Sequence, residues 1–124
     1  MPKKILVVDD SITVRQQASL ALVAAGYAVI EAVDGLDALD KLAANADAAM
    51  VICDVNMPRL SGIDFLERMK QGGQHAGIPV VMLTTEANPT LIERAKRAGA
   101  KAWVTKPCKD ELLVRTVTKI AGPA

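Results

Sequence analysis

The feature that most constrains the fold is a set of four short apolar runs, each of which ends in a charged or hydroxyl-bearing residue. The runs KILVVDD, VICD, PVVMLT and AWVTK end at Asp9 and Asp10, at Asp54, at Thr84 and at Lys106. Because apolar and polar residues do not alternate within them, they predict strands buried on both faces, as in a parallel sheet. The carboxyl ends of parallel strands meet at one edge, where ligands bind in open α/β folds, so we expect these polar side chains to lie together.

The segments between these runs favour helices. Ser11 can cap a first helix that ends at Gly26, and a second helix begins at Gly35. Further helices are expected over residues 63–69, 89–98 and 110–121, and strands over residues 5–8, 27–32, 48–53, 79–83 and 102–105. Strands and helices thus alternate with short connections. With right-handed crossovers, this order predicts an α/β fold: a doubly wound, five-stranded parallel sheet with helices on both faces.

Length and composition bound the kind of protein. At 124 residues the chain fits one domain, so we expect residues 1–124 to form a single unit with no output domain. Half of the residues are apolar but only three are aromatic, which suits an aliphatic core between helices and a parallel sheet. Cys53 and Cys108 form no metal-ligand or disulfide pattern and are expected to be reduced thiols. Without a signal-peptide core or a membrane-spanning run, we expect a soluble cytoplasmic protein that does not contact membranes.

Three carboxylates would meet at the predicted sheet edge, from Asp9, Asp10 and Asp54. At about 4 Å and a surface-like dielectric each pair repels by about 4 kcal/mol, so the group requires a cation. Ligation by oxygen alone, without His or Cys, favours Mg²⁺, with Mn²⁺ as a substitute and with waters and a backbone carbonyl completing the shell. An acidic rim that only keeps the protein soluble would not need the Lys106 and Thr84 that converge on the same edge.

This set of side chains suits phosphoryl transfer. A carboxylate can attack phosphorus to form an acyl phosphate, while a metal and a lysine neutralise the equatorial oxygens and a hydroxyl donates to one of them. In this interpretation Asp54 is the nucleophile, Asp10 holds the metal and Asp9 holds the metal or its water. Lys106 pairs with the Asp54 carboxylate before transfer and with the phosphoryl group afterwards. The Thr84 hydroxyl turns inward to reach a phosphoryl oxygen.

The same residues resemble a known family. The pair DD at positions 9 and 10, the pattern D-x-N-M-P-x-x-x-G over residues 54–62, Thr84, and K-P at positions 106 and 107 are similar to the receiver domain of bacterial two-component response regulators. The resemblance covers the whole chain and is strongest to stand-alone chemotaxis regulators. It implies the flavodoxin-like strand order 2-1-3-4-5, the order known for flavodoxin and for that chemotaxis regulator. It also implies Mg²⁺-dependent phosphorylation of Asp54 by a phosphohistidine of a sensor histidine kinase, and a main-chain carbonyl ligand from Asn56.

The resemblance further implies a signalling protein rather than a turnover enzyme. Thr84 and an aromatic residue, here Trp103, would form a switch that remodels the surface of residues 89–98, 102–105 and 110–121 to bind a target, in chemotaxis. Asn56 and Glu86 occupy the positions that tune hydrolysis of the acyl phosphate. The Lys106–Pro107 bond is expected to be cis, because the family uses that isomer to aim the lysine.

There are three alternative functions, each typical of a different kind of protein. A haloacid dehalogenase-type phosphatase also forms an aspartyl phosphate, but its D-x-D-x-T/V pattern is missing where D-D-S-I follows the first strand. A flavodoxin-type nucleotide module needs a phosphate loop there, and two acids would repel phosphate. A receiver that acts as a phosphate sink or scaffold in another pathway is left open.

Charge is distributed unevenly along the chain. Residues 1–89 carry seven Lys and Arg against eleven Asp and Glu, net −4, whereas residues 90–124 carry eight against three, net +5. We expect part of the basic segment to surround Trp103 and steer an acidic peptide or helix of the target onto the output surface. Nucleic-acid binding is not expected, because no helix-turn-helix signal or exposed aromatic platform accompanies the charge. The sensor kinase and an auxiliary phosphatase are the other expected partners, and the protein is expected to be a monomer.

Overall fold

The computed structural model describes residues 2–85 and 88–124. Strands and helices alternate along the described chain, in the order β1 (Lys4–Val8), α1 (Ile12–Ala24), β2 (Ala28–Ala32), α2 (Gly35–Ala44), β3 (Met50–Cys53), α3 (Gly62–Gln71), β4 (Val80–Thr84), α4 (Pro89–Ala98), β5 (Ala102–Thr105) and α5 (Asp110–Ala121). The bounds of α4, β5 and α5 are those predicted from the sequence. In the described chain, no helix combines the length and the apolar character needed to cross a membrane.

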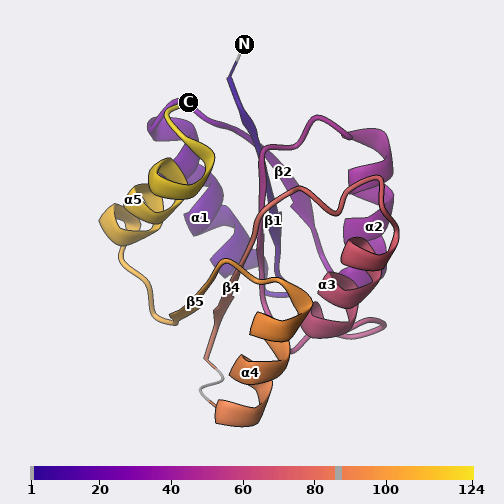
Figure 1. Ribbon diagram of the computed structural model, residues 1–124. Helices are drawn as coiled ribbons and strands as arrows, with labels where there is room; N and C mark the ends of the chain where they lie inside the picture. Colours follow the sequence, from indigo (N-terminus) through magenta and orange to yellow (C-terminus); the bar gives the residue numbers. More distant parts are fainter. Residues whose placement is uncertain (1, 86–87) are drawn as a thin grey trace.

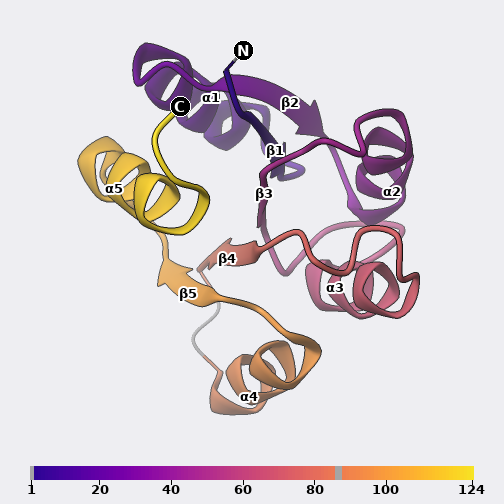
Figure 2. The same cartoon turned by 45° about the horizontal axis from the view of Figure 1, so that its top comes forward.

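The five strands form one parallel sheet in the order β2-β1-β3-β4-β5, which confirms the predicted doubly wound topology. Helices α1 and α5 cover one face, and α2, α3 and α4 cover the other (Figures 1 and 2). The register aligns the strand ends, since Val8 pairs with Cys53 and Thr84 pairs with Thr105. The residues that follow Val8 and Cys53 therefore emerge side by side at the same edge.

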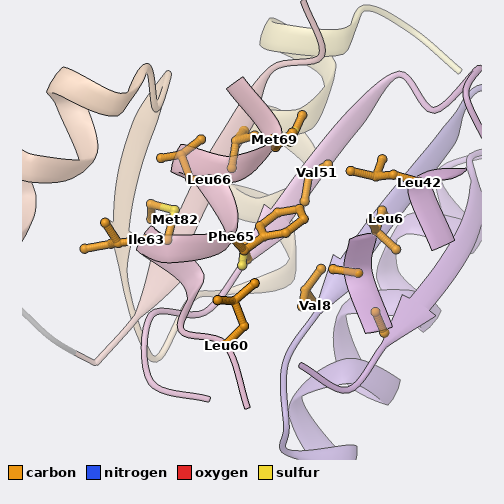
Figure 3. Packing of buried hydrophobic residues seen from close by; sticks show 14 of the residues in the cluster. Leu6, Val8, Leu42, Val51, Leu60, Ile63, Phe65, Leu66, Met69 and Met82 are labelled. Atoms are coloured by element: carbon orange, nitrogen blue, oxygen red, sulfur yellow. The ribbon is translucent and has the colours of Figure 1, made fainter. Parts of the chain in front are cut away.

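Two apolar clusters hold the helices on the sheet. On the α2–α4 face, Phe65 and Leu66 of α3 pack with Val51 and Met82 of the sheet and with Leu42 of α2 (Figure 3). On the α1–α5 face the cluster joins residues of the sheet to both helices; it includes Ile5, Val7, Ala18, Leu22, Tyr27, Met50, Ile52, Leu113 and Val117. Aliphatic side chains dominate both clusters, as the composition predicts.

Side-chain caps explain where most helices begin. Ser11, Asp34, Ser61 and Asn88 each accept a hydrogen bond from a backbone N–H in the first turn of the helix that follows. Several predicted bounds were wrong at this level of detail. Strand β1 begins at Lys4 rather than Ile5, and β4 spans Val80–Thr84 rather than residues 79–83. Helix α3 is longer at both ends than residues 63–69, because the Ser61 cap lets it begin at Gly62.

Two strands begin later than predicted because of the turns before them. Strand β2 begins at Ala28 rather than Tyr27, because the Tyr27 N–H donates to the Leu22 carbonyl and so belongs to the end of α1. Strand β3 begins at Met50 rather than Ala48, because the Ala48 N–H donates to the Asn45 carbonyl in a turn. In both cases local hydrogen bonds after a helix delay the strand.

Candidate functional site

The carboxyl ends of β1 and β3 bring three acids together. Asp9 and Asp10 follow β1, Asp54 follows β3, and each offers one carboxylate oxygen within 4.8 Å of the others. The Asp54 N–H donates to the Val8 carbonyl at 3.0 Å, which extends the β1–β3 pairing into the site. Asp9 and Asp54 are buried, at 3% and 8% exposure, whereas Asp10 is exposed. Asp10 thus faces solvent, and the cluster is open on that side.

The Lys106 ammonium lies against this cluster from the end of β5. Its Nζ is 2.6 Å from Oδ2 of Asp9 and 3.4 Å from Oδ2 of Asp54. Burial acts to lower the pKa of Lys106, but the hydrogen bond that its ammonium donates to Asp9 and the charges of both carboxylates outweigh it, so the pKa is raised. The sequence interpretation paired Lys106 with Asp54, whereas the shorter contact is to Asp9. The Lys106–Pro107 bond is cis, the isomer that the resemblance implied.

The β3–α3 loop (residues 54–61) continues from the phosphoacceptor candidate. Oδ1 of Asp54 accepts the Val55 N–H at 2.7 Å, and the Gly62 N–H donates to the Val55 carbonyl at 2.9 Å. A side chain at Gly62 would place Cβ 1.8 Å from the Asp54 carbonyl oxygen. The glycine of the motif therefore lets the start of α3 pass directly against Asp54. Asn56 is an exposed residue of this loop.

The proposed switch residues lie on neighbouring strands. Thr84 ends β4 and is fully buried, and its carbonyl accepts the Lys106 N–H at 2.9 Å. Trp103 pairs in register with Met82 and packs, half-buried, against the cluster of Figure 3. It also lines a pocket between α4 and β5 together with Ile92, Ala95, Lys96, Ala100 and Lys101. Glu86, the second expected tuning residue, lies outside the described residues.

The donor set fits a hard divalent cation. Within the described residues the cluster offers carboxylate oxygens alone, without imidazole or thiolate, and this chemistry favours Mg²⁺ over zinc or copper. The nearby Cys53 thiol is fully buried, and burial raises its pKa well above the usual value. It is therefore a neutral core side chain, and among the described residues the candidate cation cluster does not include it. Cys53 and Cys108 are both free thiols, as expected.

Sequence reasoning missed one supporting residue of the site, Arg15. Its Nη1 donates to the Asp9 carbonyl at 2.6 Å, and its Nε lies 3.2 Å from Glu31. The Ser11 N–H also donates to Oδ1 of Asp9, at 2.9 Å. Both contacts fix the backbone that carries the acids. The signal was present in the sequence, because Arg15 is the one charged residue in the thirteen residues of α1.

Comparison with known proteins identifies the class. The family model of the response regulator receiver domain matches residues 5–118, so the chain belongs to that family. Within it, the chain is 36% identical over 120 residues to the chemotaxis protein CheY1 of Helicobacter pylori, covering 96% of this chain and 97% of that protein. The structure of chemotaxis response regulator CheY4 of Vibrio cholerae matches with a TM-score of 0.88 and 40% identity, over 97% of this chain and 99% of that one. A BeF3-activated DrrB receiver domain matches with a TM-score of 0.85 and 28% identity, over 97% of both chains.

Proposed function

We propose that this receiver domain accepts one phosphoryl group on Asp54 from a histidine kinase, in an Mg²⁺-dependent reaction, and relays chemotaxis signals. The observation that carries the proposal is the meeting of Asp9, Asp10 and Asp54 with the partly buried ammonium of Lys106. The likeness to CheY1 and CheY4 supports the chemotaxis role. The length match supports a single receiver domain over residues 1–124, since the chain spans 97% of CheY1.

The protein's own groups have distinct tasks in the transfer. An Asp54 carboxylate oxygen attacks phosphorus, an O–P bond forms, and the N–P bond of the phosphohistidine breaks with its electron pair passing to the imidazole nitrogen. Asp9, Asp10, Asp54 and the Asn56 carbonyl would hold Mg²⁺, which neutralises charge on the phosphoryl oxygens. Lys106 supplies a second positive charge beside Asp54. The Thr84 hydroxyl donates to a phosphoryl oxygen and so reports the transfer.

The output surface proposed for the phosphorylated protein is formed by α4, β5 and α5. Lys96 and Lys101 line the α4–β5 pocket beside Trp103, which suits an acidic peptide or helix with an apolar anchor. A receiver acting only as a phosphate sink would have no target there. Binding of an acidic target that weakens with salt and strengthens with phosphorylation distinguishes the two roles.

The test offers the protein Mg²⁺ and a small acyl phosphate and follows intact mass. We expect one added phosphoryl group in the wild type, none in Asp54→Asn, and none when the metal is chelated. Asp47→Asn is the matched control, because Asp47 is an exposed aspartate paired with Lys4, outside the cluster, and this variant should be modified like the wild type. A wild type that stays unmodified, or one that turns over phosphomonoesters repeatedly, would contradict the proposal.

A further inference from the structure

The β3–α3 loop makes a tight turn at Arg59. The Leu60 N–H donates to the Pro58 carbonyl at 2.8 Å, and Arg59 between them has a φ of 66°. A positive φ is unfavourable for residues other than glycine. Such residues keep this conformation only where surrounding contacts enforce it. The contacts that enforce this turn come from the start of α2.

Arg59 binds Asp34, the N-cap residue of α2. Its Nε lies 2.6 Å from Oδ2 of Asp34, and its Nη2 lies 2.9 Å from Oδ1, a two-point contact between guanidinium and carboxylate. Asp34 is buried, and its Oδ1 also accepts the Asp37 N–H at 2.8 Å as the N-cap of α2. The carboxylate that holds the loop is therefore itself fixed by the helix.

A second contact joins the same two segments beside the ion pair. The Gly35 N–H donates to the Leu60 carbonyl at 3.1 Å, and a Cβ on Gly35 would lie 2.5 Å from that oxygen. The Leu60 side chain is buried in the cluster that contains Val8 and Phe65 (Figure 3). Arg59 is thus held through its side chain, and Leu60 is held through both its backbone and its side chain.

Asn56 lies between two fixed points of the loop. On one side the Gly62 N–H binds the Val55 carbonyl, and on the other Arg59 and Leu60 bind the start of α2. We propose that Asp34 and Arg59 are positioning residues that hold the loop so that the Asn56 carbonyl faces the cation site of Asp9, Asp10 and Asp54. The inference rests on the metal site of the proposed function. The pair acts through the backbone of residues 56–60 rather than by ligating the cation.

Arg59→Gln separates positioning from simple electrostatics. Loss of a positive side chain near an acidic site would, by charge alone, strengthen cation binding. If Arg59 instead positions the loop, its replacement should weaken cation binding. We expect the Kd for Mg²⁺, measured by calorimetry without any phosphodonor, to rise about tenfold, as when outer partners of metal ligands are removed. Arg94→Gln is the matched control, since it removes the same charge from a guanidinium paired with Asp64 and Glu67, and its Kd should be unchanged or lower.

Asp34→Asn tests the other partner, because asparagine keeps the N-cap acceptor and removes the charge that holds Arg59. We also expect that combining Asp34→Asn with Arg59→Gln does not raise the Kd for Mg²⁺ further. The Kd of the double variant should be no higher than that of the single variant that binds Mg²⁺ more weakly, because both changes break the same contact. Arg59→Lys keeps the charge without the two-point contact and should weaken binding less; it replaces Arg59→Gln if thermal melting shows that the latter is unfolded.

Folded Arg59 variants that bind Mg²⁺ as tightly as the wild type would overturn the inference and leave the proposed function intact. A lower melting temperature in EDTA with an unchanged Kd would likewise reduce the pair to a structural role and overturn the inference. A wild type that fails to bind Mg²⁺ would instead contradict the metal site on which the proposed function depends.

Discussion

Gly62 shows how one residue constrains the site. Its φ is not in the left-handed region, so the requirement for glycine is spatial: the Asp54 carbonyl and Met82 leave no room for a side chain. The hydrogen bond from Gly62 to Val55 holds the first turn of α3 against the end of β3. The motif glycine, recognised in the sequence by its spacing from Asp54, thus has a packing reason that the spacing alone did not reveal.

Gly62→Ala should therefore destabilise the protein. A methyl group at this position forces the backbone of Asp54 or of α3 to move, and overpacking of this kind costs about 1–3 kcal/mol. Urea unfolding in EDTA measures the loss. Gly77→Ala is the control, because a Cβ at Gly77 meets nothing within 4 Å and its stability should change by less than about 0.5 kcal/mol. Equal stability of the two variants would show that α3 can retreat from Asp54 freely.

At the scale of elements, α4 is the helix best described by local signals. Asn88 accepts the Thr90 N–H at 2.8 Å, Pro89 occupies the first turn, and Gly99 ends the helix with a φ of 103°. These residues act within a few positions of one another, which is why the sequence predicted the bounds of α4. The fold as a whole was predictable for the same reason, since strand runs and caps are local.

The contacts that the sequence did not predict are those between distant segments. The ion pair of Asp34 with Arg59 joins residues 25 positions apart, and no local pattern indicates that these two residues pair. The closer approach of Lys106 to Asp9 than to Asp54 depends on how β5 and β1 end in space. The predicted strand ends indicated which residues would lie close together, but they did not determine which side-chain atoms would be in contact.

Asn88→Ala should destabilise α4 without changing its packing face. The variant loses the side-chain acceptor for the Thr90 N–H, and the loss of an N-cap costs about 1 kcal/mol. Thermal melting should show a lower Tm, whereas Asn88→Ser, which keeps an acceptor, should stay near the wild type. If alanine and serine melt alike, the cap does not contribute to the cooperative unfolding of the domain.

At the scale of the whole molecule, paired carboxylates make stability depend on pH. Hydrogen bonds from Arg59, Arg94 and Lys4 lower the pKa values of Asp34, Asp64 and Asp47 below the ordinary value of 3.8. The unfolded chain then binds more protons than the folded one just below that value. The contribution of these pairs is complete above the ordinary pKa and is lost as the pH falls through the lowered, native values.

We therefore expect the free energy of unfolding, measured with urea in EDTA, to fall as the pH is lowered from about 5 to about 3. Arg94→Gln frees Asp64 from its partner, so the fall should be shallower in that variant. A slope that is identical in wild type and variant would show that the Arg94 pair does not stabilise the native state.

The contacts of Lys106 join one edge of the sheet to its middle. Strand β5 lies at one edge of the sheet and pairs only with β4 among the described strands, yet the lysine that follows it contacts the acids that follow β1 and β3. Under the proposed function, a phosphoryl group on Asp54 would change the contacts of Lys106, which follows one of the two edge strands. Trp103 lies three residues before Lys106, on β5, so Lys106 would link the proposed transfer at the middle of the sheet to the edge strand that carries Trp103.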